Sequence, residues 1–520
     1  MRSERLTWLV AVLGTVGAAS TVACRKRPAV ANGVVTASAE SLSSAGDNAT
    51  NAKMWMPVLT GMGVNASGIP WATGRMHKPF DFGSGTVAPS QKGDIYLAKI
   101  DPMTCLASAT FLLGGSGGRD LASNGVAVAS RGNVGIIGTF TGEIEFTPHH
   151  ADRSGPSGKT GVPGLDFLQT GSFVPFYAVL DGTSNGAHVT PVKAHMVEVG
   201  QGALMSIASN PGQNAFAICG RTDKAVPAWS DTGANRGVIT GGHAVAGGDW
   251  DIVVAKIDAA TGAVIWGKQF GGVGDQVCDS VAIDNDGDVI VAGGYSGALS
   301  LGGIALPPAA NTPELALLYA AKLNGATGEV MAARTWGGEG RSSAYGLAVD
   351  ANGNIVVAGA LGGSVDFGGG ISIAGQGLTD AFVVKLTPEL VPVWAKSFGD
   401  AQDQGVKSVG VSSKGTVFVG GSFQGSLGML GLTSAGRTAT NAFTAELAGA
   451  DGAVLAAHAY GDATGAQTVG VVTVARAATG RLADSTFIGG SFWGTLTFGS
   501  TSLTTDGPRS LTGYIARMFP

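Results

Sequence analysis

The sequence predicts an all-β protein, a single closed β-propeller of about seven four-stranded blades, preceded by a signal peptide and a flexible tether. Three observations lead to this prediction. The 85 glycines and a charged fraction of only 13% suit many short strands joined by tight turns. A hairpin pattern recurs along the chain, and further strands follow each hairpin. Finally, the repeats are evenly spaced, and repeat folds exceed ordinary domain sizes, so 520 residues fit one domain.

The N-terminus has the pattern of an export signal. A short positive region precedes the apolar stretch 6–19, which is too short to span a bilayer comfortably. We therefore expect residues 1–23 to be a signal peptide that is absent from the mature fold. Its end, TVAC, resembles the lipobox of bacterial lipoproteins, which implies cleavage and acylation at Cys24. Thr21 stands where that motif usually has Leu, and simple cleavage with full secretion is the alternative.

The segment after the signal is expected to be a tether. Residues 24–52 are rich in Ala, Ser, Asn and Gly without periodicity, so they cannot bury a core. The propeller is then expected at residues 53–520. The net charge of −5 gives no basic surface for phosphate backbones or anionic lipid, which argues against nucleic acid and leaves the lipid anchor as the only membrane contact.

The repeat itself begins with two alternating apolar strands around a turn that contains glycine. This hairpin occurs at 279–293, 345–359, 407–420 and, less cleanly, 124–138. The residues Lys256, Lys322, Lys385 and Glu446 occupy one position of the third strand in successive repeats, at steps of 66, 63 and 61 residues, and such even spacing favours radial repetition. Third strands are expected near Asp94, Pro175, Asp251, Leu317, Asp380, Asn441 and Gly513. They give about seven blades, with six or eight left open.

Ring closure needs one more strand. The chain reaches a third strand at 513–519 with no fourth strand after it, and an open edge invites aggregation. We expect residues 54–58, just before the first hairpin, to pair with that edge and close the ring.

A small extra hairpin is expected between the second and third strands. Its pattern recurs at 363–369, 421–427, 490–499 and 138–146. Together with the strands DAFVVKL (380–386) and VWAKSFG (393–399), it resembles the bacterial secreted β-propeller-repeat (SBBP-type) lipoproteins. The resemblance implies a propeller in an exported, cell-envelope setting, and it supplies no general catalytic residues.

Two features have competing interpretations as a metal site or a covalent bond. Asp284, Asp286 and Asp288 alternate as in a calcium loop, but the aligned repeats favour a hairpin turn, and no other cofactor is indicated. Cys219 and Cys278 lie on strands of neighbouring repeats and can form a disulfide, whereas the simpler interpretation is that of small buried residues.

The segment 258–266 (DAATGAVIW) resembles the docking motif of quinoprotein dehydrogenases and of lipoprotein propellers that help assemble outer-membrane barrels. In those folds the Trp packs between blades. Only this repeat has the complete motif, and the paired cysteines usual beside the quinone are missing. These departures argue against a quinone enzyme and leave an envelope-assembly scaffold as an alternative.

Ligands are expected at one face of the disc. The connections from second to third strands and the turns between blades lie at the same end of a propeller, and aromatic residues there can stack on sugars or anchor a protein. The candidates are Phe82, Trp229, Trp250 and Trp493, and the competing interpretation is that they fold loops back onto the blades. Aspartates at the same end, including Asp275 and Asp403, either cap turns or hide a catalytic pair.

The function expected from these observations is a non-catalytic, monomeric, exported lipoprotein. It would act as a scaffold or binding module at the bacterial cell envelope, with an envelope protein or a glycan as partner. Without lipidation, the location would be periplasmic or extracellular. The alternatives are a propeller hydrolase or lyase acting on an extracellular glycan, an envelope-assembly scaffold, and a purely structural surface protein.

Overall fold

The structure is a computed structural model. It describes residues 8–11 and 58–518, apart from gaps at 77–78, 83–85, 90–92, 115–118, 150–166, 183–189, 198–201, 211, 224–238, 241–249, 309–316, 338–339, 437–438, 499–500 and 506–510. Cys24 and the expected tether lie outside the described residues, as does Trp229.

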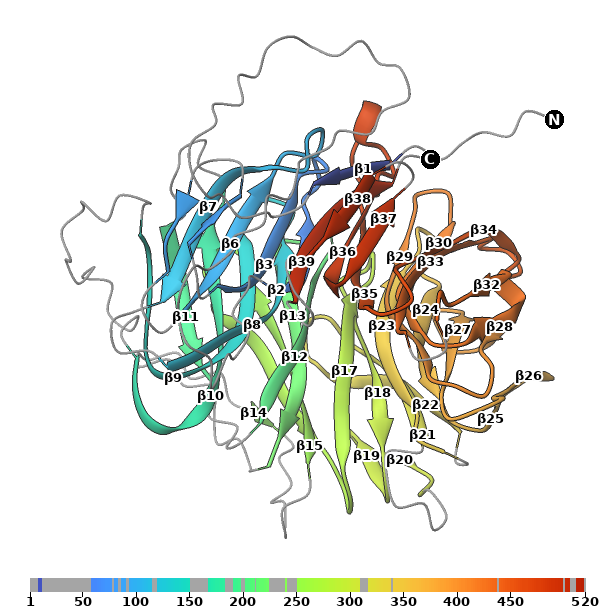
Figure 1. The fold of residues 1–520 in the computed structure, drawn as a ribbon. Coiled ribbons are helices and arrows are strands. Elements are labelled where there is room, and N and C mark those ends of the chain that lie inside the picture. Colours follow the sequence, from blue (N-terminus) through green and yellow to red (C-terminus); the bar gives the residue numbers. More distant parts are fainter. Residues whose placement is uncertain are drawn as a thin grey trace.

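Seven antiparallel four-stranded blades follow one another along the chain and close into a ring (Figure 1), which confirms the predicted fold class. Blade 1 consists of β2 (Val58–Val64), β3 (Pro70–Met76), β6 (Asp94–Ile100) and β7 (Ala107–Gly114). Blade 2 consists of β8 (Arg119–Val128), β9 (Val134–His149), β10 (Phe167–Asp181) and β11 (Thr190–Met196). Blade 3 consists of β12 (Ala203–Ser209), β13 (Ala215–Thr222), β15 (Asp251–Asp258) and β16 (Val264–Phe270). In blade 3, β14 (Ile239–Thr240) also pairs with β16.

The remaining blades have the same strand order. Blades 4 to 7 are β17 (Gln276–Ile283), β18 (Val289–Tyr295), β21 (Leu317–Leu323), β22 (Val330–Gly337); β23 (Ser343–Val349), β24 (Ile355–Leu361), β27 (Asp380–Leu386), β28 (Pro392–Phe398); β29 (Gln404–Val411), β30 (Val417–Phe423), β33 (Asn441–Leu447), β34 (Val454–Tyr460); and β35 (Ala466–Val474), β36 (Thr486–Trp493), β39 (Thr512–Met518), β1 (Trp8–Ala11). Every third strand lies where the repeat pattern places it.

Within the described ranges, the extra hairpins form in five blades. They are β4 (Phe80–Asp81) with β5 (Thr86–Val87), β19 (Leu299–Leu301) with β20 (Ile304–Leu306), β25 (Ser364–Gly368) with β26 (Ile371–Ala374), β31 (Ser426–Leu427) with β32 (Leu432–Thr433), and β37 (Thr495–Phe498) with β38 (Thr501–Thr504). The expected hairpin at 138–146 is not separate, because this stretch continues β9 and pairs with a long β10. Two short 3-10 helices, η1 (Gly428–Leu430) and η2 (Gly480–Leu482), are the only helices among the described residues.

The core lies between blades. The second and third strands have neighbours on both sides, so β18, β24 and β27 are buried along their whole length, whereas the outer strand β34 is largely exposed. The buried apolar side chains among the described residues form seven clusters, each shared by two adjacent blades. One cluster joins Phe487 and Ile515 of blade 7 to Tyr96 of blade 1, so hydrophobic burial itself closes the ring.

The strand that completes blade 7 differs from the prediction. β1 pairs with β39, matching Trp8 with Met518 and Ala11 with Ile515, whereas Val58 begins the inner strand of blade 1 and residues 54–57 lie outside the described part. An open edge offers only backbone N–H and C=O groups, and these accept any extended segment. β1 lies within residues 1–23, the expected signal peptide.

Successive blades are also joined by a polar contact, which we call the latch, that uses a tryptophan of the outer strand. Trp266 Nε1 donates to Gly325 O of the next blade at 3.0 Å, and Trp394 Nε1 donates to Gly449 O at 3.2 Å. A Cβ on Gly328 or on Gly452 would lie 2.7 Å from the respective ring, and both glycines have a φ of +70°. Among the described residues the latch to the turn between the third and fourth strands of the next blade occurs twice, and the sequence motif indicated only the first occurrence. A third outer-strand tryptophan, Trp336, donates instead to Phe367 O in the extra hairpin of the next blade at 3.1 Å.

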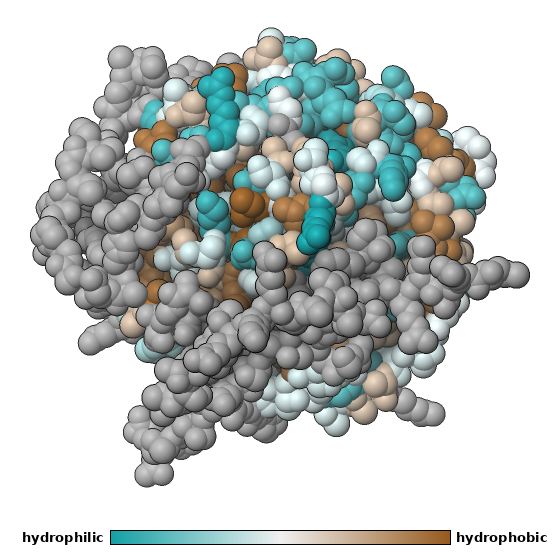
Figure 2. Space-filling model, turned by 90° about the horizontal axis from the view of Figure 1, so that it is seen from above, coloured by the Kyte–Doolittle hydropathy of each residue, from teal (hydrophilic) through white to brown (hydrophobic). Residues whose placement is uncertain are grey.

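Figure 2 shows one face of the molecule, where apolar residues lie in small areas between hydrophilic ones on the coloured part of the surface. Scattered apolar residues of this kind are normal for a protein surface.

Candidate ligand site at the loop-rich mouth of the channel

The two ends of the disc differ in what they carry. Because neighbouring strands run in opposite directions, the extra hairpins and the turns between blades share one end, which we call the loop-rich face. The turns between first and second strands and between third and fourth strands share the other end, the turn face. The innermost strands line a central channel. Its part near the turn face is a cavity of about 220 Å³ lined mainly by Val, Ile, Leu and Ala, and Arg476 Nη1 donates there to Val349 O.

The channel mouth at the loop-rich face is polar. It forms a cavity of about 300 Å³ lined by the first halves of the innermost strands, including Asn124, Ser206, Asp279, Tyr345 and Lys407. These residues come from blades 2 to 6.

Asp279 on β17 is the unusual group in this mouth. Its Oδ2 is buried and has no hydrogen-bond partner among the described residues. Burial raises the pKa of Asp279 to about 7, although Arg221, Lys407 and Arg341 each act to lower it. One carboxyl group is thus surrounded by three cations from blades 3, 5 and 6, and it still holds its proton near neutral pH.

Two of the cations stack on aromatic rings. The Arg221 guanidinium lies 4.3 Å from the centroid of the Trp250 ring, and Lys407 Nζ lies 4.0 Å from the centroid of the Tyr345 ring. Cation–π contacts hold these charges in place without neutralising them. The mouth therefore keeps positive charge.

A second cavity of about 350 Å³ adjoins the mouth and shares Tyr345 and Lys407 with it. It lies between blades 5 and 6, and most of its lining residues bear hydroxyl, amide or charged groups, although apolar atoms form about half of the lining surface. Thr379 Oγ1 donates to Asp403 Oδ1 at 3.0 Å, and Gln424 Nε2 donates to Thr440 Oγ1 at 3.0 Å. These bonds fix the polar walls of the cavity.

The predicted ligand-face aromatics have different outcomes. Phe82 is 1% exposed and packs on Phe80 and Tyr96, with ring centroids 4.5 and 4.9 Å away, so its assignment to a ligand face is wrong. Its loop folds back because the ring is stabilised by the apolar core below. Trp250 and Trp493 are half-buried, and Trp250 lies under Arg221.

Asp284 and Asp288 form salt bridges with a lysine of the same blade. Lys322 Nζ lies 2.8 Å from Asp284 Oδ2 and 3.3 Å from Asp288 Oδ2, and Asp284 Oδ1 accepts the amides of Asp286 and Asp288 at 3.0 and 2.8 Å. In this structure the Lys322 ammonium lies between the two carboxylates, which form a salt-bridged hairpin turn, the interpretation that the aligned repeats favour. Asp286 contributes no carboxylate contact. No group of three or more metal-ligating side chains occurs in the described part of the chain.

The aspartates of the loop-rich face cap turns. Asp275 Oδ1 accepts the amide of Trp250 at 3.1 Å. Asp400 accepts from Gln402 N and from Ser426, and although burial opposes it, these bonds lower the pKa of Asp400. The same holds for Asp462, which accepts the amides of Thr464 and Thr495. Both carboxyls are held as anions by the backbone.

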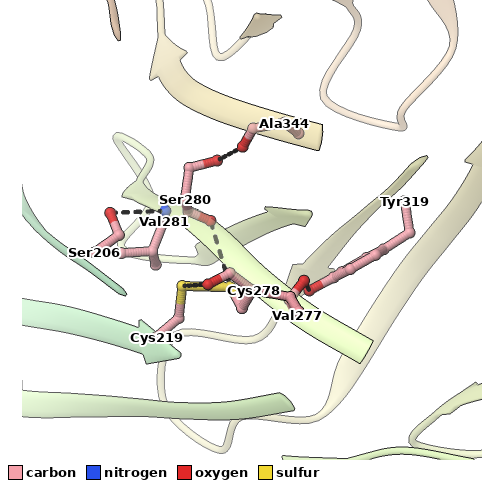
Figure 3. Close-up of a disulfide and its surroundings, with 8 residues drawn as sticks. All are labelled: Ser206, Cys219, Val277, Cys278, Ser280, Val281, Tyr319 and Ala344. Atoms are coloured by element: carbon pink, nitrogen blue, oxygen red, sulfur yellow. Dashed lines mark hydrogen bonds between the residues drawn. A yellow bond between two sulfur atoms is a disulfide. The ribbon is translucent and has the colours of Figure 1, made fainter. Parts of the chain in front are cut away.

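Cys219 on β13 and Cys278 on β17 form a disulfide between blades 3 and 4, with a Cα–Cα distance of 5.8 Å (Figure 3). Beside it, Ser280 Oγ donates to Ala344 O of blade 5 at 2.8 Å, and Tyr319 OH donates to Val277 O at 3.2 Å. The remaining cysteine in the described residues, Cys105, is buried, and burial raises the pKa of its thiol to about 12.

The fold and this mouth define a seven-bladed β-propeller with a polar cavity at one face. No protein-family model and no curated protein matches the chain. Three solved structures similar to it are the β-propeller domain of Cps50 (Swd1) from Myceliophteria thermophila (6% identity, TM-score 0.32, 69% of this chain and 79% of that one), quinohemoprotein alcohol dehydrogenase from Comamonas testosteroni (9%, 0.40, 90% and 75%), and a protein of unknown function from Dyadobacter fermentans (8%, 0.36, 76% and 93%). Likeness at this level carries no information about activity. None of the helices in the described residues has the length and hydropathy needed to cross a membrane.

Proposed function

We propose that this protein is a non-catalytic binding scaffold of the bacterial cell envelope, exported and lipid-anchored through Cys24, which presents its loop-rich face to an envelope protein or a glycan. The observation that carries the proposal is the pair of adjoining cavities at the channel mouth, whose linings together include residues of all seven blades and many polar groups. Concave polar sites at the junction of several elements are typical ligand sites.

Two further observations support the exported, non-catalytic setting. Disulfides persist in oxidising compartments such as the periplasm, and Cys219 is bonded to Cys278. Asp400 and Asp462, which the sequence places on the candidate face, are held as anions by turn amides, so neither is suited to act as a general acid. The resemblance of the repeat to SBBP-type lipoproteins points to the same setting.

Anchoring is tested by intact mass and detergent partitioning of the protein expressed in a bacterial host, beside Cys24→Ser. We expect the wild type to carry a diacylglyceryl mass and to enter the detergent phase, and the variant to do neither. Wild-type protein without the added mass in the aqueous phase would contradict the anchor and indicate simple secretion.

Binding without turnover is tested on a panel of cell-wall and extracellular glycans, with interferometry for binding and mass spectrometry for products. We expect saturable binding and unchanged glycans. No saturable ligand at all would favour a purely structural surface protein.

A glycan hydrolase or lyase is the second candidate because Asp279 is a buried carboxyl with a pKa of about 7 in the mouth, which suits a general acid or base. Product formation that is lost in Asp279→Asn, and retained in Asp275→Asn and Asp403→Asn, would establish this alternative.

A further inference from the structure

The cavity between blades 5 and 6 combines positive charge with hydrogen-bonding groups. Arg341 and Lys407 line it, and Lys407 also lines the channel mouth. The acidic residue in its lining is Asp403, whose Oδ1 already accepts from Thr379. Asp279 lies next to this cavity, and a carboxyl with a pKa of about 7 is largely uncharged in mildly acidic solution. A ligand in this place therefore meets a positive potential.

The rest of the lining indicates what kind of anion fits. Apart from Ala360, Gly405 and the ring of Tyr345, every lining residue bears a hydroxyl, amide or charged group. Ser343, Ser422 and Gln404 supply donors and acceptors. The wall also exposes apolar atoms, including those of Ala360 and the Tyr345 ring, and a sugar ring suits both parts because it has hydroxyls along its edge and C–H groups on its faces.

The size also fits a sugar residue. About 350 Å³ lies at the lower end of small-ligand sites, which run from roughly 300 to 1,000 Å³. The adjoining mouth offers about 300 Å³ more, so a chain of sugars can continue from one cavity into the other.

We propose that this cavity binds a carboxylated glycan, with Lys407 and Arg341 pairing with a uronate carboxylate and the hydroxyl and amide groups of blades 5 and 6 bonding the sugar hydroxyls. The proposal rests on the proposed binding function and names its ligand class.

Asp279 makes this binding depend on pH. The charged and titratable groups that face it are Arg221 on β13, Tyr319 on β21, Arg341 before β23 and Lys407 on β29. Below pH 7 Asp279 is protonated, so its carboxyl no longer competes with the ligand for these cations. Above pH 7 its negative charge competes for the same cations and repels the uronate. Affinity therefore falls as the pH rises from 6 to 8.

The test is calorimetric titration of the full chain with a galacturonate hexasaccharide at near-physiological salt, with the methyl-esterified hexasaccharide as the neutral probe. We expect saturable binding of the acid form and affinity at least about tenfold lower for the ester. Lys407→Gln and Arg341→Gln should each weaken binding of the acid form about tenfold. Lys414→Gln is the matched control, because this exposed lysine lies in the turn at the opposite end of β29 and its loss changes the net charge equally.

Circular dichroism and the thermal midpoint show that each variant is folded. Asp279→Asn supplies an independent readout, because its affinity should no longer change between pH 6 and pH 8. Lack of saturable binding of the acid hexasaccharide, or wild-type affinity in Lys407→Gln, would overturn the proposal. If a neutral glycan binds instead, this proposal fails while the binding scaffold stands. If neither this probe nor any member of the glycan panel binds, both fail.

Discussion

The turn face and the loop-rich face use the same kinds of charged side chain in opposite ways. At the turn face Lys322 is paired with Asp284 and Asp288, Lys385 with Asp350, and Lys256 donates to two backbone carbonyls of the next blade at 2.7 and 2.9 Å. At the loop-rich face Asp279 has an oxygen without a hydrogen-bond partner in the described part of the chain, and Lys407 packs on the Tyr345 ring and lines a cavity. The paired charges join strands of one blade, and the lysine bonds to backbone carbonyls join neighbouring blades, whereas charged groups that line a cavity can contact a ligand.

The largest test of this comparison is Lys322→Met. It leaves the largely buried carboxylates of Asp284 and Asp288 close together without their cation, so we expect the free energy of unfolding at pH 7 to fall by about 3 kcal/mol. Urea denaturation measures the change, with Lys414→Met as a control that removes an exposed charge. A loss no greater than that of the control would show that this salt bridge does not stabilise the turn face.

Asp279→Asn should have a smaller effect of opposite sign at the loop-rich face. The folded pKa of about 7 lies above the ordinary value of 3.8, so the folded protein binds this proton more tightly and loses stability as the pH rises from about 4 to about 7. The uncharged variant has no such carboxyl, so its stability does not fall in this way as the pH rises. It should be more stable than wild type by roughly 2 kcal/mol at pH 8 and equal to it near pH 4. Denaturation midpoints at the two pH values measure this difference, and a pH-independent difference would contradict it.

The smallest expected effect separates the latch from ordinary turn strain. Gly452→Ala adds a Cβ 2.7 Å from the Trp394 ring at a φ of +70°, whereas Gly415→Ala adds one at a φ of +85° with nothing within 4 Å. Both substitutions destabilise the protein by about 1 kcal/mol because alanine disfavours the left-handed backbone conformation, and only the first also disturbs a latch. We expect Gly452→Ala to be the more destabilising by about 1 kcal/mol in the same denaturation experiment. Equal losses of stability in the two variants would mean that the Trp394 side chain moves aside at no cost.

The blades were predictable from sequence because each is encoded locally. Alternating strands and glycine turns such as the one at Gly353 need only neighbours in the chain, and counting the repeats indicated about seven blades, with six or eight left open. The closing strand was not predictable in this way. Pairing with β39 uses backbone groups that almost every residue has, and only Pro57, which lacks an N–H, distinguishes residues 54–58 from β1 as its partner.

The candidate site was largely missed for a related reason. Asp279, Arg341 and Lys407 come from three different blades, and no local spacing connects them. The same applies to Trp394, whose latch partner Gly449 lies 55 residues further on in the next blade. A signal was present in the aligned repeats, because Asp279 and Lys407 occupy the same position of their inner strands, at the bulge where the pairing with the second strand shifts. The aromatic pattern instead favoured Phe82, whose place in a loop does not reveal that its ring is buried.

The pairing of β1 with β39 has a consequence for how the protein is made. A protease that cuts between Ala23 and Cys24 would discard Trp8–Ala11 and leave one side of the seven-residue strand β39 without a backbone partner. Maturation and ring closure then compete for the same four residues. If the predicted cleavage follows ring closure, blade 7 loses β1 and keeps three strands. If cleavage comes first, another segment can pair with β39 instead.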